Sequence, residues 1–343
     1  MNKIMRNKLE LNINLDIVRI FAAFMVLSVH IGQIVGFDFS IGAKGVPIFF
    51  VLSGYLGFKS YDKVLSMKAY IKKRFIRIVP TYYISLVIVY FFDLYKYSKT
   101  MSLEEILVKG PCGIRFFRFF FFLQTIIPTD NWQLWGNRNA TWSMSSFVFF
   151  YLIVPILYKL INKFWKMIGI IGGLVFLKPY IISFLIKYLS FYPTEASIEY
   201  FVGSSPLITL ISFLFGACIF FAEKEKKEGI YIVLSCLCLF MSNFSFYQFE
   251  LLTVIFILTT LHTKMLVNHS RVKNLISIFS KGSFCLYLLH PILLQIGKEL
   301  WINWGRSSNK VVYLLFLYLF SMGCSYVFYW KILRKFENYL RKG

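Results

Sequence analysis

Acidic residues, and charged residues in general, are scarce in this chain. It holds 16 Asp and Glu residues among 343, and all charged residues together make up 16% of the sequence. Soluble globular proteins carry about 25% charged residues, so this composition excludes an ordinary soluble domain. Instead, 58% of the residues are hydrophobic, 20% are aromatic, and the mean hydropathy is +0.64. The composition predicts a polytopic membrane protein.

Cysteine and histidine are also few, with six and four residues. The cysteines form no CxxC motif and no Cys/His spacing typical of a zinc site. Most of them lie in apolar runs, where cysteine behaves as a small hydrophobic residue. The sequence therefore predicts neither a disulfide framework nor a bound metal.

Basic residues are the one abundant charged class, and the formal net charge is +22. They lie in short segments between apolar runs, which the positive-inside rule explains without nucleic acid as a partner. With the N-terminus inside, inner segments hold 25 of the 38 Lys and Arg residues. This favours an all-α bundle of about ten transmembrane helices forming one membrane domain over residues 1–343. The predicted spans begin near Leu15, Gly45, Ile78, Thr141, Met167, Pro206, Ile230, Phe249, Ser283 and Val311.

The first span, LDIVRIFAAFMVLSVHIGQ, carries an arginine and a histidine. As a helix, the eleven-residue step from Arg19 to His30 returns to within about 20° of the same face and rises about 16 Å. We expect one stripe with polar ends and slim residues between them, along which a narrow molecule can lie. Its members are Asp16, Arg19, Ala23, Val26, His30 and Gln33.

Two interpretations of this stripe are open. Arg19 can reach to the headgroups, and His30 can be a packing histidine. Alternatively, a charge within a span faces a partner or a wet cavity, and Asp16 is the nearest partner for Arg19. The shared face favours a functional site.

A second arginine pair follows an amphipathic segment, VLSMKAYIKKRFIRI, which begins at Val64. The segment has the pattern of an interfacial helix. It ends in Arg74 and Arg77, just before Pro80, a residue best tolerated in the first turn of a helix. Two guanidinium groups and a helix N-terminus predict a cytoplasmic phosphate site. An ordinary positive-inside run is the alternative.

The longest outer segment, residues 93–140, contains an aromatic run from Phe116 to Ile127 and then a Trp-rich stretch. The run is too short to span and is interrupted by Arg118, so it is expected at the interface or dipping into the membrane. Trp132 and Trp135 either bind a sugar or anchor the interface, and we prefer anchoring. Lys178, next to Pro179, either lines a cavity or reaches to the headgroups.

Four stretches of this sequence together resemble the acyltransferase-three family of integral membrane O-acyltransferases, which modify bacterial surface polysaccharides. The stretches are LDIVRIFAAFMVLSVH, GVPIFFVLSGYL, KKRFIRIVP and GSFCLYLLHP, and they follow the family's order from residue 15 to residue 291. By that resemblance, Arg19 and His30 look like the family's paired essential residues. Arg74 and Arg77 look like its second arginine motif, and acetyl-CoA is the implied donor.

The segment TWSMSSFVFFYLIVP is similar to a further family segment, in which Trp-Ser is followed by a glutamate. This chain has Phe147 at the aligned position, between Ser146 and Val148. That departure bears on any mechanism that requires the carboxylate.

The residues and the resemblance together predict acyl transfer from cytoplasmic acetyl-CoA to a hydroxyl of a cell-surface or exported carbohydrate or glycolipid. The enzyme is expected in the bacterial inner membrane, with both termini cytoplasmic. His30 acts as general base, or is itself transiently acylated, and Asp16 orients Arg19. Arg19 either holds the donor or stabilises the oxyanion. The predicted donor-binding residues are Arg74, Arg77 and Arg19, and the predicted acceptor-binding residues are Trp142, Ser143 and Gln33.

Two other functions stay open. A transporter or flippase of glycan or lipid intermediates also keeps Arg and His within spans, although the sequence shows no repeated halves. An acyltransferase relative that has lost catalysis is the other, and Phe147 is its main support.

Overall fold

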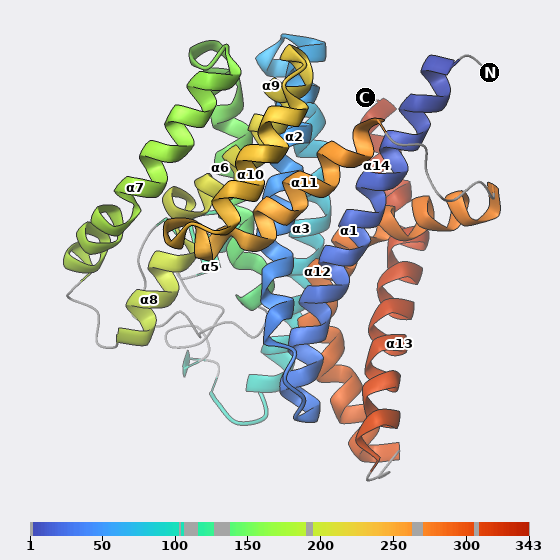
Figure 1. Ribbon diagram of the computed structural model, residues 1–343. Coiled ribbons are helices and arrows are strands. Elements are labelled where there is room, and N and C mark those ends of the chain that lie inside the picture. Colours follow the sequence, from blue (N-terminus) through green and yellow to red (C-terminus); the bar gives the residue numbers. More distant parts are fainter. Residues whose placement is uncertain are drawn as a thin grey trace.

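The computed structural model describes residues 3–102, 104–105, 116–126, 138–189, 195–262, 270–304 and 309–342. Within these ranges every regular element is a helix (Figure 1). The elements are α1 (Lys3–Val35), η1 (Ser40–Lys44), α2 (Gly45–Val64), α3 (Met67–Tyr97), α5 (Phe116–Phe120), α6 (Arg138–Leu160), α7 (Phe164–Tyr188), α8 (Glu195–Ser204), α9 (Pro206–Glu225), α10 (Glu228–Leu239), η2 (Ser242–Tyr247), α11 (Gln248–His262), α12 (Ser270–Trp304), α13 (Lys310–Phe328), the π-helical η3 (Tyr329–Leu333) and α14 (Arg334–Lys342).

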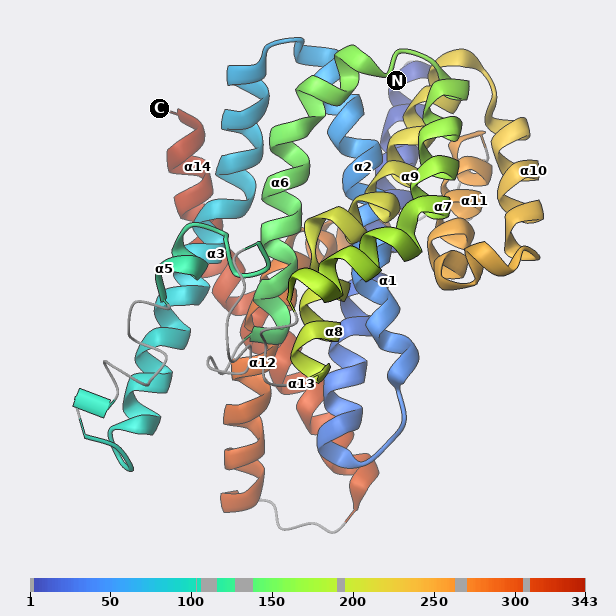
Figure 2. The ribbon, with the colours of Figure 1, turned by 90° about the vertical axis from the view of Figure 1, so that its left-hand side faces the viewer.

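Nine helical segments of the described chain are long and apolar enough to cross a membrane. The tenth predicted span, near Ile230, is α10, whose 12 residues extend about 18 Å, less than a hydrocarbon core of about 30 Å. The prediction of an all-α polytopic bundle with about ten transmembrane helices is confirmed. α1 begins and α14 ends at the same end of the bundle, where the basic α2–α3 connection also lies (Figures 1 and 2).

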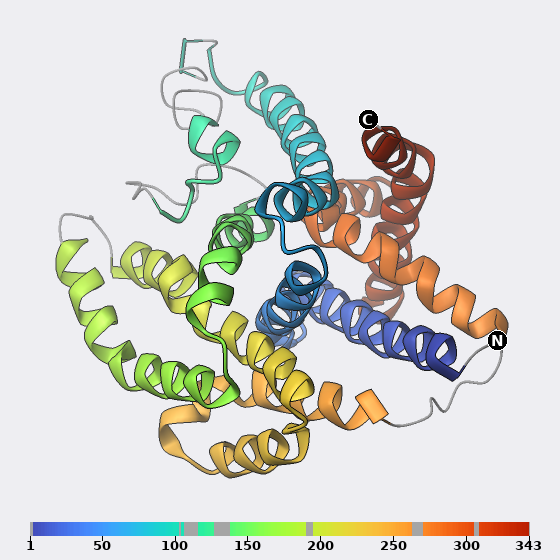
Figure 3. The ribbon, with the colours of Figure 1, turned by 90° about the horizontal axis from the view of Figure 1, so that it is seen from above.

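α2 lies at the centre of the bundle when it is seen from above (Figure 3) and packs closely against α9. The two backbones meet at glycines. A methyl group on Gly54 would lie 1.9 Å from the carbonyl oxygen of Phe213, and one on Gly216 would lie 1.8 Å from that of Val51. Only a residue without Cβ fits at either position, so these glycines set the distance between the two helices.

The connection from α1 to α2 folds back along α1. A methyl group on Gly42 would lie 2.2 Å from the carbonyl oxygen of Met25, and one on Gly45 would lie 2.4 Å from that of Ala22. α2 therefore begins beside the middle of α1 rather than at its end, and its first turns pack against that part of α1.

α3 corrects one sequence prediction. The amphipathic segment is not a separate interfacial helix that ends before Pro80. It forms the first turns of α3, which begins after Ser66, whose hydroxyl accepts a hydrogen bond from the Ala69 amide at 3.4 Å, and runs through Pro80 to Tyr97. Arg74 and Arg77 therefore lie inside a continuous helix, about two to three turns beyond its N-terminus. Local sequence favours a break at Pro80, whereas packing against other helices keeps the helix continuous.

The aromatic run that begins at Phe116 forms the short helix α5 followed by turns, and it packs on α3. The Tyr82 hydroxyl donates to the carbonyl oxygen of Phe119 at 2.7 Å, and the Tyr83 hydroxyl to that of Phe120 at 2.8 Å. Ile127 and the predicted interfacial residues Trp132 and Trp135 lie outside the described residues.

Candidate active site

Asp16 and Arg19 lie one turn apart on α1 and form the predicted ion pair. Arg19 donates from Nη1 to Asp16 Oδ1 at 2.7 Å, and both side chains are largely buried. The Ser280 hydroxyl of α12 donates to the same oxygen at 2.6 Å. Asp16 is thus oriented by a second helix, and its carboxylate fixes the Arg19 guanidinium.

Arg74 and Arg77, on α3, are close enough to Arg19 for their charges to interact with its guanidinium. We call these three residues the arginine cluster. The Arg74 guanidinium lies 5.3 Å from the Tyr70 ring centroid and 5.0 Å from that of Tyr151, and it donates to the carbonyl oxygen of Leu56. Arg74 is therefore held between two aromatic faces, a geometry that suits a planar cation.

Arg77 differs from Arg74 because its side chain is exposed. Two carboxylates act on its charge, Asp16 from α1 and Glu337 from α14. Among the described residues, the three guanidinium groups thus share the two carboxylates Asp16 and Glu337. An exposed, net cationic group of this kind can bind an anion such as a phosphate.

His30 lies farther along α1, eleven residues or about 16 Å from Arg19. Its ring stacks on that of His290 from α12, with 4.9 Å between centroids and 28° between planes. His30 Nδ1 lies 3.2 Å from Gln33 Oε1. An Nδ1–H donated to this oxygen leaves Nε2 as the basic nitrogen.

His290 is the histidine of the GSFCLYLLHP stretch, and the structure makes it the neighbour of His30. It is 1% exposed, and its Nδ1 lies 2.7 Å from the carbonyl oxygen of Tyr287. That bond fixes the tautomer with the hydrogen on Nδ1. His290 Nε2 has no hydrogen-bond partner among the described residues. The His30–His290 pair therefore presents ring nitrogens that the surrounding protein does not saturate.

Ser143 and Trp142 take different places. The Ser143 hydroxyl lies 2.7 Å from the Tyr287 hydroxyl, and Tyr287 lies one turn before His290 on α12. Ser143 thus joins the histidine end of the site through Tyr287. Trp142 is half-buried and meets Phe50 edge-on, with 6.0 Å between ring centroids. Its role in binding the acceptor stays a prediction.

The prediction of an open stripe between Arg19 and His30 is wrong, because the stripe residues between them are buried. Ala23 is 2% exposed and Val26 is 4% exposed, and Val26 packs near Gly45 at the start of α2. Slim residues allow another helix to approach as readily as they leave room for a ligand, and here the protein fills the space.

Phe147 occupies an aromatic cluster. It is 6% exposed, with its ring 5.0 Å from that of Phe50 and 6.5 Å from that of Tyr151. The neighbouring Ser146 hydroxyl lies 2.9 Å from that of Thr209. The position that would carry the family's glutamate is therefore built for an apolar ring.

Glu250 on α11 is a buried carboxylate that the sequence reasoning missed. It is 2% exposed and accepts a hydrogen bond from the Ser212 hydroxyl at 2.8 Å. Lys178 acts on its charge and lies 4.6 Å from the Tyr247 ring centroid, so Lys178 faces protein rather than headgroups. A lone acidic residue in the apolar segment FELLTVIF was the available signal.

No group of three His, Cys, Asp or Glu side chains in the described part of the chain is placed to hold a metal ion. The site offers guanidinium groups, imidazoles and hydroxyls. These groups can bind an anion and move a proton.

The chain belongs to the acyltransferase-three family, since the family's acyltransferase domain matches residues 12–330. It is similar to nodulation protein 10 of Rhizobium leguminosarum bv. viciae, at 26% identity over 183 residues, which cover 46% of each chain. It is also similar to a protein of Acidianus two-tailed virus with the provisional name acetyltransferase ORF330, at 27% identity over 157 residues, 44% of this chain and 43% of that one. The matches thus span less than half of these relatives. No solved structure matches the chain.

The family and the fold together define a multi-pass membrane protein of the acyltransferase-three family. The family assignment that the four sequence stretches implied is confirmed.

Proposed function

We propose that this acyltransferase moves an acetyl group from cytoplasmic acetyl-CoA to a hydroxyl of a cell-surface or exported carbohydrate. The single observation that carries the proposal is that α1 holds both His30 and Arg19, the residue around which the arginine cluster gathers. The cluster gathers three guanidinium groups, and the phosphates of coenzyme A are the anions that it would bind. One relative has a name that includes acetyltransferase.

In the proposed reaction, His30 acts as the general base. Its Nε2 removes the proton from the acceptor hydroxyl while the oxygen attacks the thioester carbonyl. The carbon–sulfur bond breaks, and the coenzyme A thiolate leaves and takes up the proton that His30 carries. Gln33 and His290 hold the His30 ring in place through the 3.2 Å contact and the stacking.

Donor and acceptor sites then lie toward opposite ends of α1. We place the arginine cluster toward the cytoplasmic side of a bacterial inner membrane. The start of α1, the end of α14 and the basic α2–α3 connection lie at one end of the bundle, which the positive-inside rule makes cytoplasmic. Because Ala23 and Val26 are buried, they do not line a path for the pantetheine arm in this conformation.

Acetyl-CoA binding to the purified protein in nanodiscs tests the donor site. Arg77→Gln should weaken the affinity about 10- to 100-fold, since a hydrogen bond between charged groups contributes about 1.5–3 kcal/mol. Lys298→Gln, which removes an exposed charge near the far end of α12, is the matched control and should bind normally. Equal affinity in both variants would remove the arginine cluster from donor binding. A transporter of glycans would show no saturable acetyl-CoA binding.

A further inference from the structure

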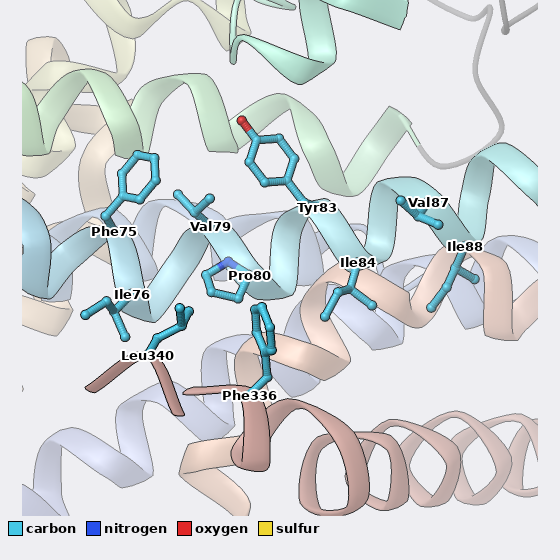
Figure 4. A pocket seen from close by; sticks show the side chains of 10 residues that line it. All are labelled: Phe75, Ile76, Val79, Pro80, Tyr83, Ile84, Val87, Ile88, Phe336 and Leu340. Carbon is cyan, nitrogen blue, oxygen red and sulfur yellow. The ribbon is translucent and has the colours of Figure 1, made fainter. Parts of the chain in front are cut away.

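An apolar groove of about 470 Å³ lies between α3 and α14 (Figure 4). Ile76, Pro80 and Ile84 of α3 form one wall, and Phe336 and Leu340 of α14 form the other. Tyr83 directs its hydroxyl away from the groove and donates it to the carbonyl oxygen of Phe120. The groove therefore offers a ligand only apolar contacts, and its volume is that of a small-molecule pocket.

The groove is open at the surface of a helix whose length and composition suit a membrane span. Its α3 wall belongs to the segment Met67–Phe92, which is long and apolar enough to span the membrane. Val87 and Phe336 line the groove and are 51% and 44% exposed. In a bilayer, the solvent around the apolar part of such a helix is hydrocarbon, and an apolar hollow open to hydrocarbon is filled by a lipid chain.

Two basic side chains lie beyond the Ile76 end of the groove. Exposed Lys72 and Lys73 come one turn before Ile76 on α3. Lysines just outside an apolar segment attract anionic headgroups. A lipid with its chain in the groove and its headgroup at this end would thus meet charges of opposite sign.

α14 also links the groove to the active site. Glu337 lies between the two groove residues of this helix, is 9% exposed, and acts electrostatically on Arg77. A lipid acyl chain bound between α3 and α14 would hold α14 in position, and with it the Glu337 carboxylate that faces the arginine cluster.

We propose that this groove is a binding site for one acyl chain of an anionic glycerophospholipid, whose headgroup lies at Lys72 and Lys73. The bound lipid supports α14 against α3. The site is independent of which acyl donor or acceptor the enzyme uses, because it is defined by the groove and its basic end.

Native mass spectrometry of the purified protein tests the proposal without an activity readout. The protein is released from nanodiscs containing equal amounts of dioleoylphosphatidylglycerol and dioleoylphosphatidylcholine, and the retained lipids are counted. The wild type should retain one phosphatidylglycerol molecule in preference to phosphatidylcholine. Val87→Trp, which adds bulk at a half-exposed groove residue, should lose it. Ile84→Trp, deeper in the groove, should do the same.

Leu319→Trp on α13 is the matched control, since Leu319 is 73% exposed and lies outside the groove. It should retain the lipid, and all three variants are first compared with the wild type in melting temperature. Replacing Lys72 and Lys73 by Gln should reduce the preference for phosphatidylglycerol about fivefold for each lysine. Equal retention by Val87→Trp, Ile84→Trp and Leu319→Trp, or equal retention of the two lipids by the wild type, would overturn the proposal.

Discussion

Replacing Phe147 by Glu tests whether this protein needs the carboxylate that the family resemblance implies at this position. The Phe147 ring is 6% exposed and packs on Phe50 and Tyr151. Removing a buried phenyl ring costs about 3–5 kcal/mol, and the new carboxyl group must be buried, either protonated or at a further cost. We expect Phe147→Glu to lower the free energy of unfolding by at least about 3 kcal/mol and to give no gain in acetyl transfer.

The matched control is Phe147→Leu, which keeps the position apolar and should cost no more than about 1.5 kcal/mol. Melting temperatures in one detergent compare the stability of the two variants. Glycan O-acetyl content per amount of inserted protein compares their activity in cells. A clear rise in glycan acetylation with Phe147→Glu would refute this reasoning, because it would show that the natural chain is weakened by the missing acid.

Two further predictions concern the bundle. Gly216→Ala should lower the melting temperature through a cost of about 1–3 kcal/mol, since its methyl group would lie 1.8 Å from the carbonyl oxygen of Val51. Gly229→Ala, with no atom within 4 Å of the new methyl group, should leave the melting temperature unchanged, and equal melting temperatures of the two variants would contradict the close α2–α9 contact. In a cysteine-free background, a membrane-impermeant maleimide should label Asp38→Cys on intact cells and Lys72→Cys only after permeabilisation, and the reverse pattern would overturn the proposed orientation.

The helices and much of the site follow from local sequence. Hydropathy places the spans, and helical periodicity places Arg19 and His30 on one helix face, because both depend on residues close together in the chain. The tertiary contacts do not follow in this way. The continuation of α3 through Pro80, the closure around Ala23 and Val26, and the Asp16–Ser280 bond depend on helices far apart in sequence.

The histidine end shows the same limit. His290 and Tyr287 are separated from His30 by more than 250 residues, and no local pattern predicts the stacking of the two imidazoles. Glu250 was visible as a lone acid in an apolar run, but its burial against Ser212 required the packed structure.

Acetyl transfer by a His30→Ala variant tests the proposed mechanism most directly. Membranes from cells with equal amounts of the wild-type or variant protein receive radiolabelled acetyl-CoA, and label in the carbohydrate fraction is counted. We expect His30→Ala to lose about 10²- to 10⁴-fold in transfer, the typical contribution of a general base, while its affinity for acetyl-CoA stays unchanged because the arginine cluster is intact. Near-normal labelling of the carbohydrate by His30→Ala membranes would contradict the assignment of His30 as the base.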